Sequence, residues 1–181
     1  TVTNNSSIDQ TPPVISSAVL ANNGLTLTLT YNEFLRDPRA PASAFTVLAN
    51  GSPVTVSSVT ANGSTQTVIL TLASTIGSGK AVTVSYAAPT VDSSISNAAI
   101  QDTAGNDAIS LTERTVTNNS SIDQTAPVFS SASLAANGLT LTLNYNEVIR
   151  DPRAPASAFT VLVDGSPVTV SSVAANGNIS T

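Results

Sequence analysis

Runs in which apolar and polar residues alternate are the main pattern along this chain. The clearest run is GLTLTLTYN at residues 24–32, where leucine alternates with threonine and the apolar face ends on Tyr31. Successive side chains of a β-strand point to opposite faces, so the leucines would be buried and the threonines would face water. The run returns as GLTLTLNYN at residues 138–146. We expect a half-buried β-strand at both places.

Shorter runs of the same kind follow along the chain, and no apolar period typical of helices accompanies them. Turn signals such as Asn22-Asn23-Gly24 and Asn50-Gly51 separate the runs. About seven short strands with turns between them predict an all-β fold, an antiparallel immunoglobulin-like (Ig-like) β-sandwich. The strands that we expect in the first two thirds of the chain are 14–20, 24–32, 45–48, 54–59, 66–72, 81–86 and 108–116.

The sequence repeats itself with a period of about 114 residues, which is the size of a whole domain. The letters TVTNNSSIDQT stand at residues 1–11 and again at 115–125, and about four in five of the positions that follow are identical. We therefore predict Ig-like sandwiches in tandem. The boundaries that we expect are the end of a preceding repeat with a linker at 1–10, a complete sandwich at 11–118, a linker at 119–124, and the N-terminal half of a second repeat at 125–181.

The second copy lacks the partners of its first strands. Half a sandwich leaves apolar strand faces and strand edges open, which favours pairing with further strands. Either these strands follow in a longer polypeptide, or a neighbouring chain supplies them, as in donor-strand polymers. Thr1–Asn5 copies Thr115–Asn119 and could donate one strand but not the others, so we favour the longer polypeptide.

Composition narrows the class of function. Charged residues make up only 9% of the chain and the net charge is −5, so we expect no nucleic-acid binding, which needs clustered Lys and Arg. The chain has no Cys and no His, which removes disulfides and the usual nucleophile–base systems. We therefore predict that the chain is not an enzyme. No apolar run is long enough to cross a bilayer, so we expect no membrane insertion in this segment.

Several stretches carry a resemblance to a known family. They are TPPVISSAVL, GLTLTLTYNE, ASAFTVLANGSPVTVSSV, SGKAVTVSYAAP and IQDTAGNDAISLT. Together they resemble the tandem repeats of giant bacterial surface proteins of the cyanobacterial swimming-motility type and related adhesins. They are also similar to the Ig-like modules of S-layer proteins, which share the ending Tyr31-Asn32-Glu33 and a turn like Ala104-Gly105-Asn106. The resemblance implies a module of a very long, secreted cell-surface protein.

Carboxylates gather where the predicted strands end, and they suggest a calcium site. Loops at one end of an Ig-like sandwich lie close together, so these groups would meet there. Oxygen ligands without His or Cys suit calcium. The candidate ligands are Glu33, Asp37, Asp102 and Asp107, with Asp9 and Asp123 as further candidates in the linkers. Alternatively, Glu33 and Asp37 pair with nearby arginines, and the Asp102–Asp107 run is an ordinary turn rich in Asp and Asn. The spacing does not match an EF-hand loop.

Two functions compete. The first is a structural spacer or stalk repeat of a long extracellular bacterial protein or filament, which mediates surface display or adhesion and whose partners are neighbouring repeats. The second is an adhesin module that binds cell-surface or matrix glycans, or a protein, through its loops. The loop EFLRDPRAPASAF at residues 33–45 returns almost unchanged as EVIRDPRAPASAF, which favours the spacer, because binding loops tend to vary between copies.

Overall fold

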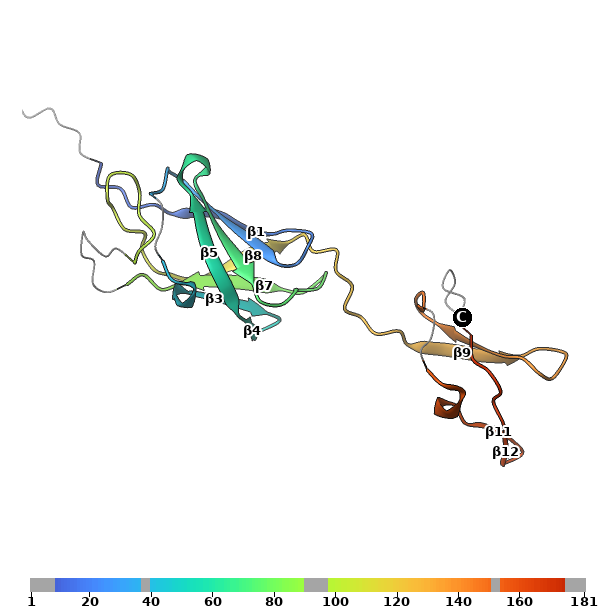
Figure 1. The fold of residues 1–181 in the computed structure, drawn as a ribbon. Helices are drawn as coiled ribbons and strands as arrows, with labels where there is room; N and C mark the ends of the chain where they lie inside the picture. Colours follow the sequence, from blue (N-terminus) through green and yellow to red (C-terminus); the bar gives the residue numbers. More distant parts are fainter. Residues whose placement is uncertain (1–8, 37–39, 90–97, 151–153, 175–181) are drawn as a thin grey trace, which may run out of the picture. The chain divides into compact units, whose positions relative to one another are not determined.

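The alternating runs of the sequence form β-strands in the structure, a computed structural model that describes residues 9–36, 40–89, 98–150 and 154–174. The chain divides into two units, Thr1–Gln124 and Thr125–Thr181, which are considered separately (Figure 1). Helical segments among the described residues are short 3-10 turns. None of the described helices has the length and apolar character needed to span a bilayer.

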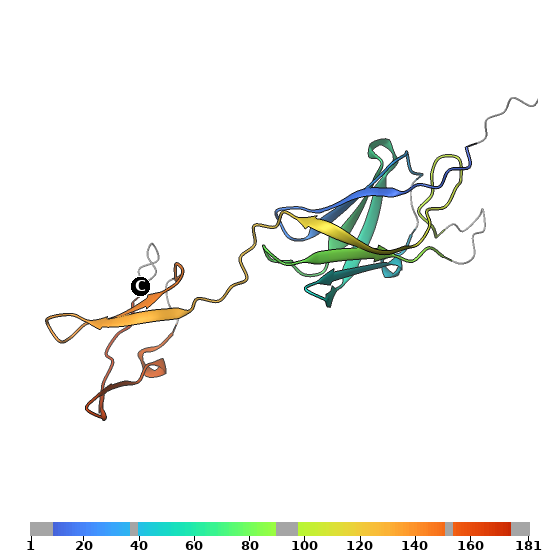
Figure 2. The same cartoon turned by 180° about the vertical axis from the view of Figure 1, so that it is seen from behind.

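The first unit is a β-sandwich whose strands form an eight-stranded sheet with the order β4-β3-β7-β8-β1-β2-β6-β5. This sheet folds over so that β1, β2, β6 and β5 face β8, β7, β3 and β4, the layer arrangement of an Ig-like sandwich (Figures 1 and 2). The predicted fold class is therefore confirmed. The strands are β1 (Ile15–Leu20), β2 (Thr26–Tyr31), β3 (Phe45–Ala49), β4 (Ser52–Val54), β5 (Val56–Asn62), β6 (Thr67–Leu72), β7 (Val82–Tyr86) and β8 (Leu111–Asn118), and the 3-10 turns are η1 (Ala42–Ala44) and η2 (Gly63–Thr65).

The core lies between the two layers and consists of the apolar faces of the strands. Strand β2 shows the predicted alternation, since its leucines and Tyr31 are buried while its threonines are only partly so. The largest side chains that are almost fully buried include Leu20, Leu27, Leu29, Leu70, Val84 and Tyr86. Phe45 packs on Tyr86 with 5.1 Å between ring centroids. With few aromatic residues available, branched aliphatic side chains provide most of the buried apolar surface.

Strand β8 closes the seam between the layers. It pairs with β7 in the antiparallel sense and with β1 in the parallel sense. The parallel pairing is short, and Arg114 lengthens the contact: its guanidinium donates to the carbonyl oxygens of Ile15, at 3.0 Å, and of Ser16. These carbonyls lie where the register of β1 shifts, so the arginine satisfies acceptors that a regular ladder would otherwise pair.

Residues 118–124, which we call the closing segment, are bonded to the first unit. The Asn118 side-chain amide donates to the carbonyl oxygens of Gly77 and Lys80, both at 3.0 Å. The carbonyl oxygen of Ile122 accepts from the backbone N–H of Ser78 at 2.8 Å. The Gln124 side chain donates to the carbonyl oxygen of Thr75 at 3.0 Å. The stretch expected as a linker is therefore hydrogen-bonded to the first unit.

Two of the expected strands differ from the observed ones for identifiable reasons. The run 54–59 is divided between β4 and β5, because the chain passes from one layer to the other at Thr55. Pro53 is tolerated in β4 because β4 is an edge strand. The last strand is Leu111–Asn118 instead of 108–116, since its end is extended by pairing with β1. The unit thus has one strand more than we expected.

The second unit repeats the first half of the first unit. Its strands are β9 (Phe129–Leu134), β10 (Leu141–Tyr145), β11 (Val161–Val163) and β12 (Ser166–Val168), with the turn η3 (Ala156–Ala158). They form two separate pairs, β9 with β10 and β11 with β12. Local details recur: Val14 N–H donates to Asn32 Oδ1 at 2.7 Å, and Val128 N–H donates to Asn146 Oδ1 at the same distance. Local structure therefore follows the sequence in both copies.

Candidate functional site

The loop before β8 holds Asp102 in a fixed orientation. Asp102 is 1% exposed, and its Oδ1 accepts the backbone N–H groups of Gly105 at 2.6 Å and Asn106 at 2.8 Å. Its Oδ2 accepts the Asn106 side-chain amide at 2.7 Å. Gly105 has φ +99°, a conformation that favours glycine. The loop is thus a tight turn built around one carboxylate.

Burial alone would raise the pKa of the Asp102 carboxyl. The hydrogen bonds from the Asn106 side chain and from the backbone N–H groups of Asn106, Gly105 and Ala104 outweigh burial and hold the pKa below its usual range. The lowered pKa favours the ionised form of Asp102, which is the form in which a carboxylate binds a metal.

Glu33 follows β2, and backbone contacts bring it beside this loop. Leu35 forms an isolated β-bridge with Asp102, and Arg36 N–H donates to the Gln101 carbonyl oxygen at 2.8 Å. Oε1 of Glu33 is buried, and within the described part of the chain it has no hydrogen-bond partner. Loss of hydration, followed by the charges of Asp102 and Asp9, raises the pKa of Glu33. Buried carboxylate oxygens are usually hydrogen-bonded in folded proteins, so this one calls for an explanation.

Asp9 reaches the same place from the segment that precedes β1. Its Oδ1 accepts the Thr11 N–H at 2.9 Å, and its carbonyl oxygen accepts the Asn106 side-chain amide at 3.2 Å. Asn106 therefore contacts both Asp9 and Asp102, which lie 93 positions apart in the sequence (102 − 9). This amide positions the two acidic residues relative to each other.

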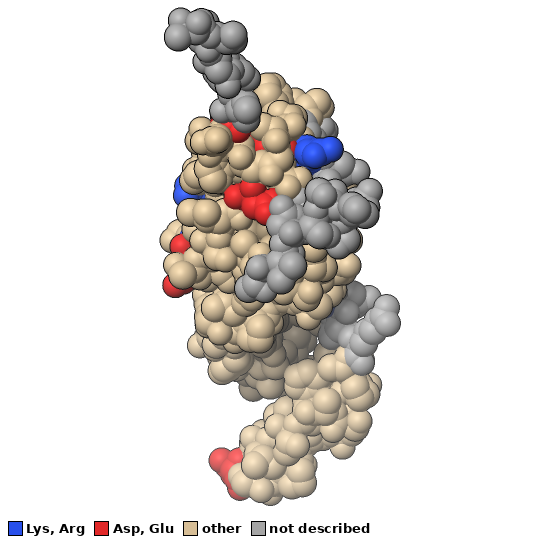
Figure 3. All heavy atoms as spheres, turned by 90° about the vertical axis from the view of Figure 1, so that its left-hand side faces the viewer, with Lys and Arg blue, Asp and Glu red and all other residues tan. Residues whose placement is uncertain are grey.

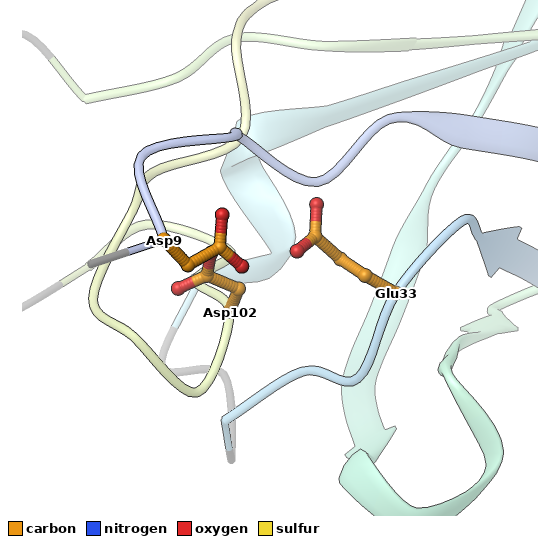
Figure 4. A group of neighbouring side chains, drawn as sticks. All are labelled: Asp9, Glu33 and Asp102. Carbon is orange, nitrogen blue, oxygen red and sulfur yellow. The ribbon is translucent and has the colours of Figure 1, made fainter. Parts of the chain in front are cut away.

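Asp9, Glu33 and Asp102 converge on one point (Figure 4). Each offers a carboxylate oxygen, and these oxygens all lie within 4.8 Å of one another. Calcium–oxygen distances of about 2.3–2.6 Å place two ligands of one ion up to ~5 Å apart, so the spacing fits a single calcium ion. Most of the face in Figure 3 carries neither acidic nor basic side chains, so a close group of carboxylates stands out.

The structure brings together only some of the acidic residues predicted from the sequence. Glu33 and Asp102 are in the group, and so is Asp9, one of the linker candidates. Asp107 is not, because its Oδ1 accepts the Gln101 side-chain amide at 2.9 Å. Asp123 is also outside the group, and Asp37 lies outside the described residues.

The alternative paired Glu33 and Asp37 with nearby arginines, and of these residues Asp37 and Arg39 lie outside the described part of the chain. Within the described residues, neither Arg36 nor any other basic side chain lies in ion-pair contact with the three grouped carboxylates. Sequence reasoning did not identify Asn106 as the residue that positions Asp9 and Asp102. Its contact with Asp102 is local to the Asp-Thr-Ala-Gly-Asn turn, but its contact with Asp9 joins residues far apart in the sequence.

Comparisons with known proteins identify the repeat family of the chain. The model of a family of flagellar system-associated repeats matches residues 8–91 and 122–181. No curated protein matches the chain. The N-terminal part of the bacterial S-layer protein SbsC has a TM-score of 0.48 at 20% identity, with 88% of this chain and 33% of that chain covered. A second structure, of S-layer protein rSbsC, has a TM-score of 0.47 at 18% identity, with 76% and 18% covered. The chain spans a third or less of these structures.

Proposed function

Since the chain belongs to the family of flagellar system-associated repeats, we propose that it is a structural spacer or stalk repeat of a long bacterial cell-surface protein. In this role each copy contributes length and mechanical stability, and surface display or adhesion is carried out by the complete protein. An extracellular position, of the kind found in cyanobacterial swimming-motility proteins, belongs to the same proposal. The low content of charged residues, only 9%, is in keeping with a Ser/Thr-rich extracellular repeat.

The observation that carries the proposal is that both copies build the same local structure, loops included. The turn η1 is preceded by Pro41 with φ −69° and ψ 156°, and η3 is preceded by Pro155 with the same angles. The Asn23 and Asn137 side chains cap equivalent turns with equal 2.9 Å bonds. A module whose loops return with few changes is suited to a mechanical task that every copy shares.

The spacer function can be tested in the bacterium that encodes the protein. One set of variants changes the number of repeats, and a second set keeps the number but replaces Arg36 and Arg150 by Ser in the corresponding loops. If the module is a spacer, adhesion or motility should change with the number of repeats and should be unaffected by the loop substitutions. Antibody labelling of intact cells tests surface exposure in the same strains.

The opposite result would refute the spacer function. If the loop variants lose adhesion while shortened arrays keep it, the module binds a glycan or a protein through its loops. Lack of antibody labelling on intact cells, with labelling after lysis, would refute the surface location.

We further propose that the group of Asp9, Glu33 and Asp102 binds calcium. Support comes from the spacing of the three carboxylates and from the buried Oε1 of Glu33, which has no donor within the described residues. Three negative charges within 4.8 Å of one another repel, and a divalent cation would reverse that repulsion. Because Asp9 precedes β1 and the other two ligands follow β2 and precede β8, binding would tie three parts of the sandwich together.

Calcium binding is tested by calorimetric titration of the whole chain with CaCl₂ after treatment with EDTA. We expect saturable binding and a higher melting temperature. At a calcium concentration one hundred times Kd, the free energy of unfolding should rise by about 2.7 kcal/mol. Glu33→Gln removes one ligand with little change of shape and should abolish both effects. Asp107→Asn is the matched control, since Asp107 belongs to the same loop but not to the group.

Two results would contradict the calcium proposal. One is the absence of binding heat together with an unchanged melting temperature at millimolar calcium. The other is an equal loss of binding in the Glu33→Gln and Asp107→Asn variants, which would place the ion elsewhere in the loop.

A further inference from the structure

The hairpin between β3 and β4 carries the dipeptide Asn50-Gly51 at its turn (Figure 1). Ala49 pairs with Ser52, so these two residues alone form the turn. Both have positive φ, 48° for Asn50 and 78° for Gly51, as in the tight turns that favour Asn-Gly. Attack of the glycine nitrogen on the asparagine side-chain carbonyl closes a five-membered ring, and glycine has no Cβ that would hinder the approach. Such a dipeptide can therefore lose ammonia without an enzyme.

The hydrogen bonds of the turn favour this reaction at Asn50. Its Oδ1 accepts the backbone N–H of Ala81 at 2.8 Å. This bond polarises the amide carbonyl and would stabilise the negative charge that develops on its oxygen during the attack. Within the described part of the chain, neither the Gly51 N–H nor the Asn50 Nδ2 forms a hydrogen bond. The attacking nitrogen and the leaving group are thus not held by bonds that would have to break first.

Two other Asn-Gly dipeptides, Asn23-Gly24 and Asn137-Gly138, have the opposite arrangement. The Gly24 N–H donates to the carbonyl oxygen of Ala21 at 3.0 Å, and the Gly138 N–H makes the equivalent bond at 2.9 Å. In both turns the asparagine Oδ1 accepts the N–H of the residue after the glycine at 2.9 Å. The nitrogen that would attack is therefore already bonded in these turns. Breaking one hydrogen bond before the attack lowers the rate by about tenfold.

The second copy shows that an aspartate fits the same turn. Asp164 stands where the first copy has Asn50, and the backbone angles agree, with φ 48° for Asp164 and 78° for Gly165. A carboxylate at position 50 can still accept the Ala81 N–H, and a charged acceptor strengthens such a bond. Conversion of Asn50 to Asp is therefore compatible with the hairpin.

We propose that Asn50 is a site of spontaneous deamidation, at which the first copy acquires the charge that the second copy encodes. The Gly51 nitrogen forms a bond to Cγ of Asn50 and loses its proton, while the Cγ–Nδ2 bond breaks and Nδ2 leaves as ammonia with that proton. Water then opens the imide ring and gives Asp, or isoaspartate where the other carbonyl–nitrogen bond is cleaved. The net reaction consumes one water, releases one ammonia and adds one negative charge to a chain whose net charge is −5.

The test incubates the whole 181-residue chain in mildly alkaline buffer, folded and, in parallel, in concentrated urea. Peptide mapping by mass spectrometry follows the replacement of NH₂ by OH at Asn23, Asn50 and Asn137 in one sample. In the folded chain, Asn50 should convert about ten times faster than the other two. In urea the three rates should become similar, because the hydrogen bonds that distinguish the turns are lost.

Two variants check the site and its product. Asn50→Gly removes the amide but keeps a residue suited to positive φ, so it should remove the fastest-forming acidic species in ion-exchange chromatography. Asn50→Asp carries the product from the start, and the first unit should then melt within about 2 °C of the parent chain.

Three results would overturn the proposal. One is a rate at Asn50 in the folded chain that does not exceed the rates at Asn23 and Asn137, which would mean that the hairpin protects the amide. Another is an acidic species that forms equally fast in the Asn50→Gly variant. The third is a clearly lower melting temperature of the Asn50→Asp variant, which would show that the turn of the first copy does not accept the product.

Discussion

Replacing equivalent leucines in the two copies separates the effect of sequence from that of tertiary cover. Leu27 and Leu141 have the same neighbours in sequence, but Leu27 is fully buried and Leu141 is 42% exposed. Leu27→Ala removes a core side chain that lies across from Leu70. Such changes cost about 2–5 kcal/mol, because apolar contacts are lost and a cavity remains. For a domain of roughly this size each kcal/mol lowers Tm by about 4 °C, so we expect a drop of ~8–20 °C.

Differential scanning calorimetry of the whole chain measures this effect. Leu141 is partly exposed to solvent, so Leu141→Ala should lower the stability of the second unit by only about 1 kcal/mol. It should leave the Tm of the first unit unchanged. If both changes lower that Tm equally, or if Leu27→Ala lowers it by less than about 3 °C, the assignment of the core to the first unit is refuted.

The remaining predictions concern the seam, a turn and the acidic group of the first unit. Arg114→Ala should cost ~1.5–3 kcal/mol in a urea titration, because charge-assisted bonds to two carbonyl oxygens are lost. Gly24→Ala should destabilise the chain far more than Gly138→Ala in the same titration: both residues have positive φ, but only a Cβ at Gly24 would lie 2.4 Å from the Ile76 carbonyl oxygen. Equal effects of the two glycine changes would contradict this packing. Without calcium, the lowered pKa of Asp102 contributes stability that is lost as pH falls below the usual Asp range, and Asp102→Asn should remove that part of the acid denaturation curve. The raised pKa of Glu33 acts in the opposite direction: it adds stability at low pH, and this stability is lost as pH rises through the folded-state pKa. In EDTA, the Glu33→Gln variant should therefore lose less stability over that pH interval than the parent chain.

The acidic group shows how far sequence reasoning reaches toward a site. Oxygen ligands without His or Cys indicate calcium from composition alone, and the ends of strands indicate where the loops meet. Which carboxylates meet depends on the turn at residues 101–107 and on the Asn106 amide, which contacts Asp9 from a distant part of the chain. Asp102 and Asp107 lie in one turn, yet only Asp102 points into the group. Direction within a turn depends on backbone angles that residue type does not specify.

Sequence pattern predicted most strands of this protein, their inward faces and the repeat. Alternation of apolar and polar residues is a local property, because neighbouring side chains of an extended backbone always point to opposite sides. Both copies accordingly form the same hairpin, with equal hydrogen bonds at Asn32 and Asn146. Which of these faces is buried depends instead on contacts between distant strands. Burial requires strands from a distant part of the chain, so Leu27 is enclosed by β6 in the first unit while the identical Leu141 remains open to solvent.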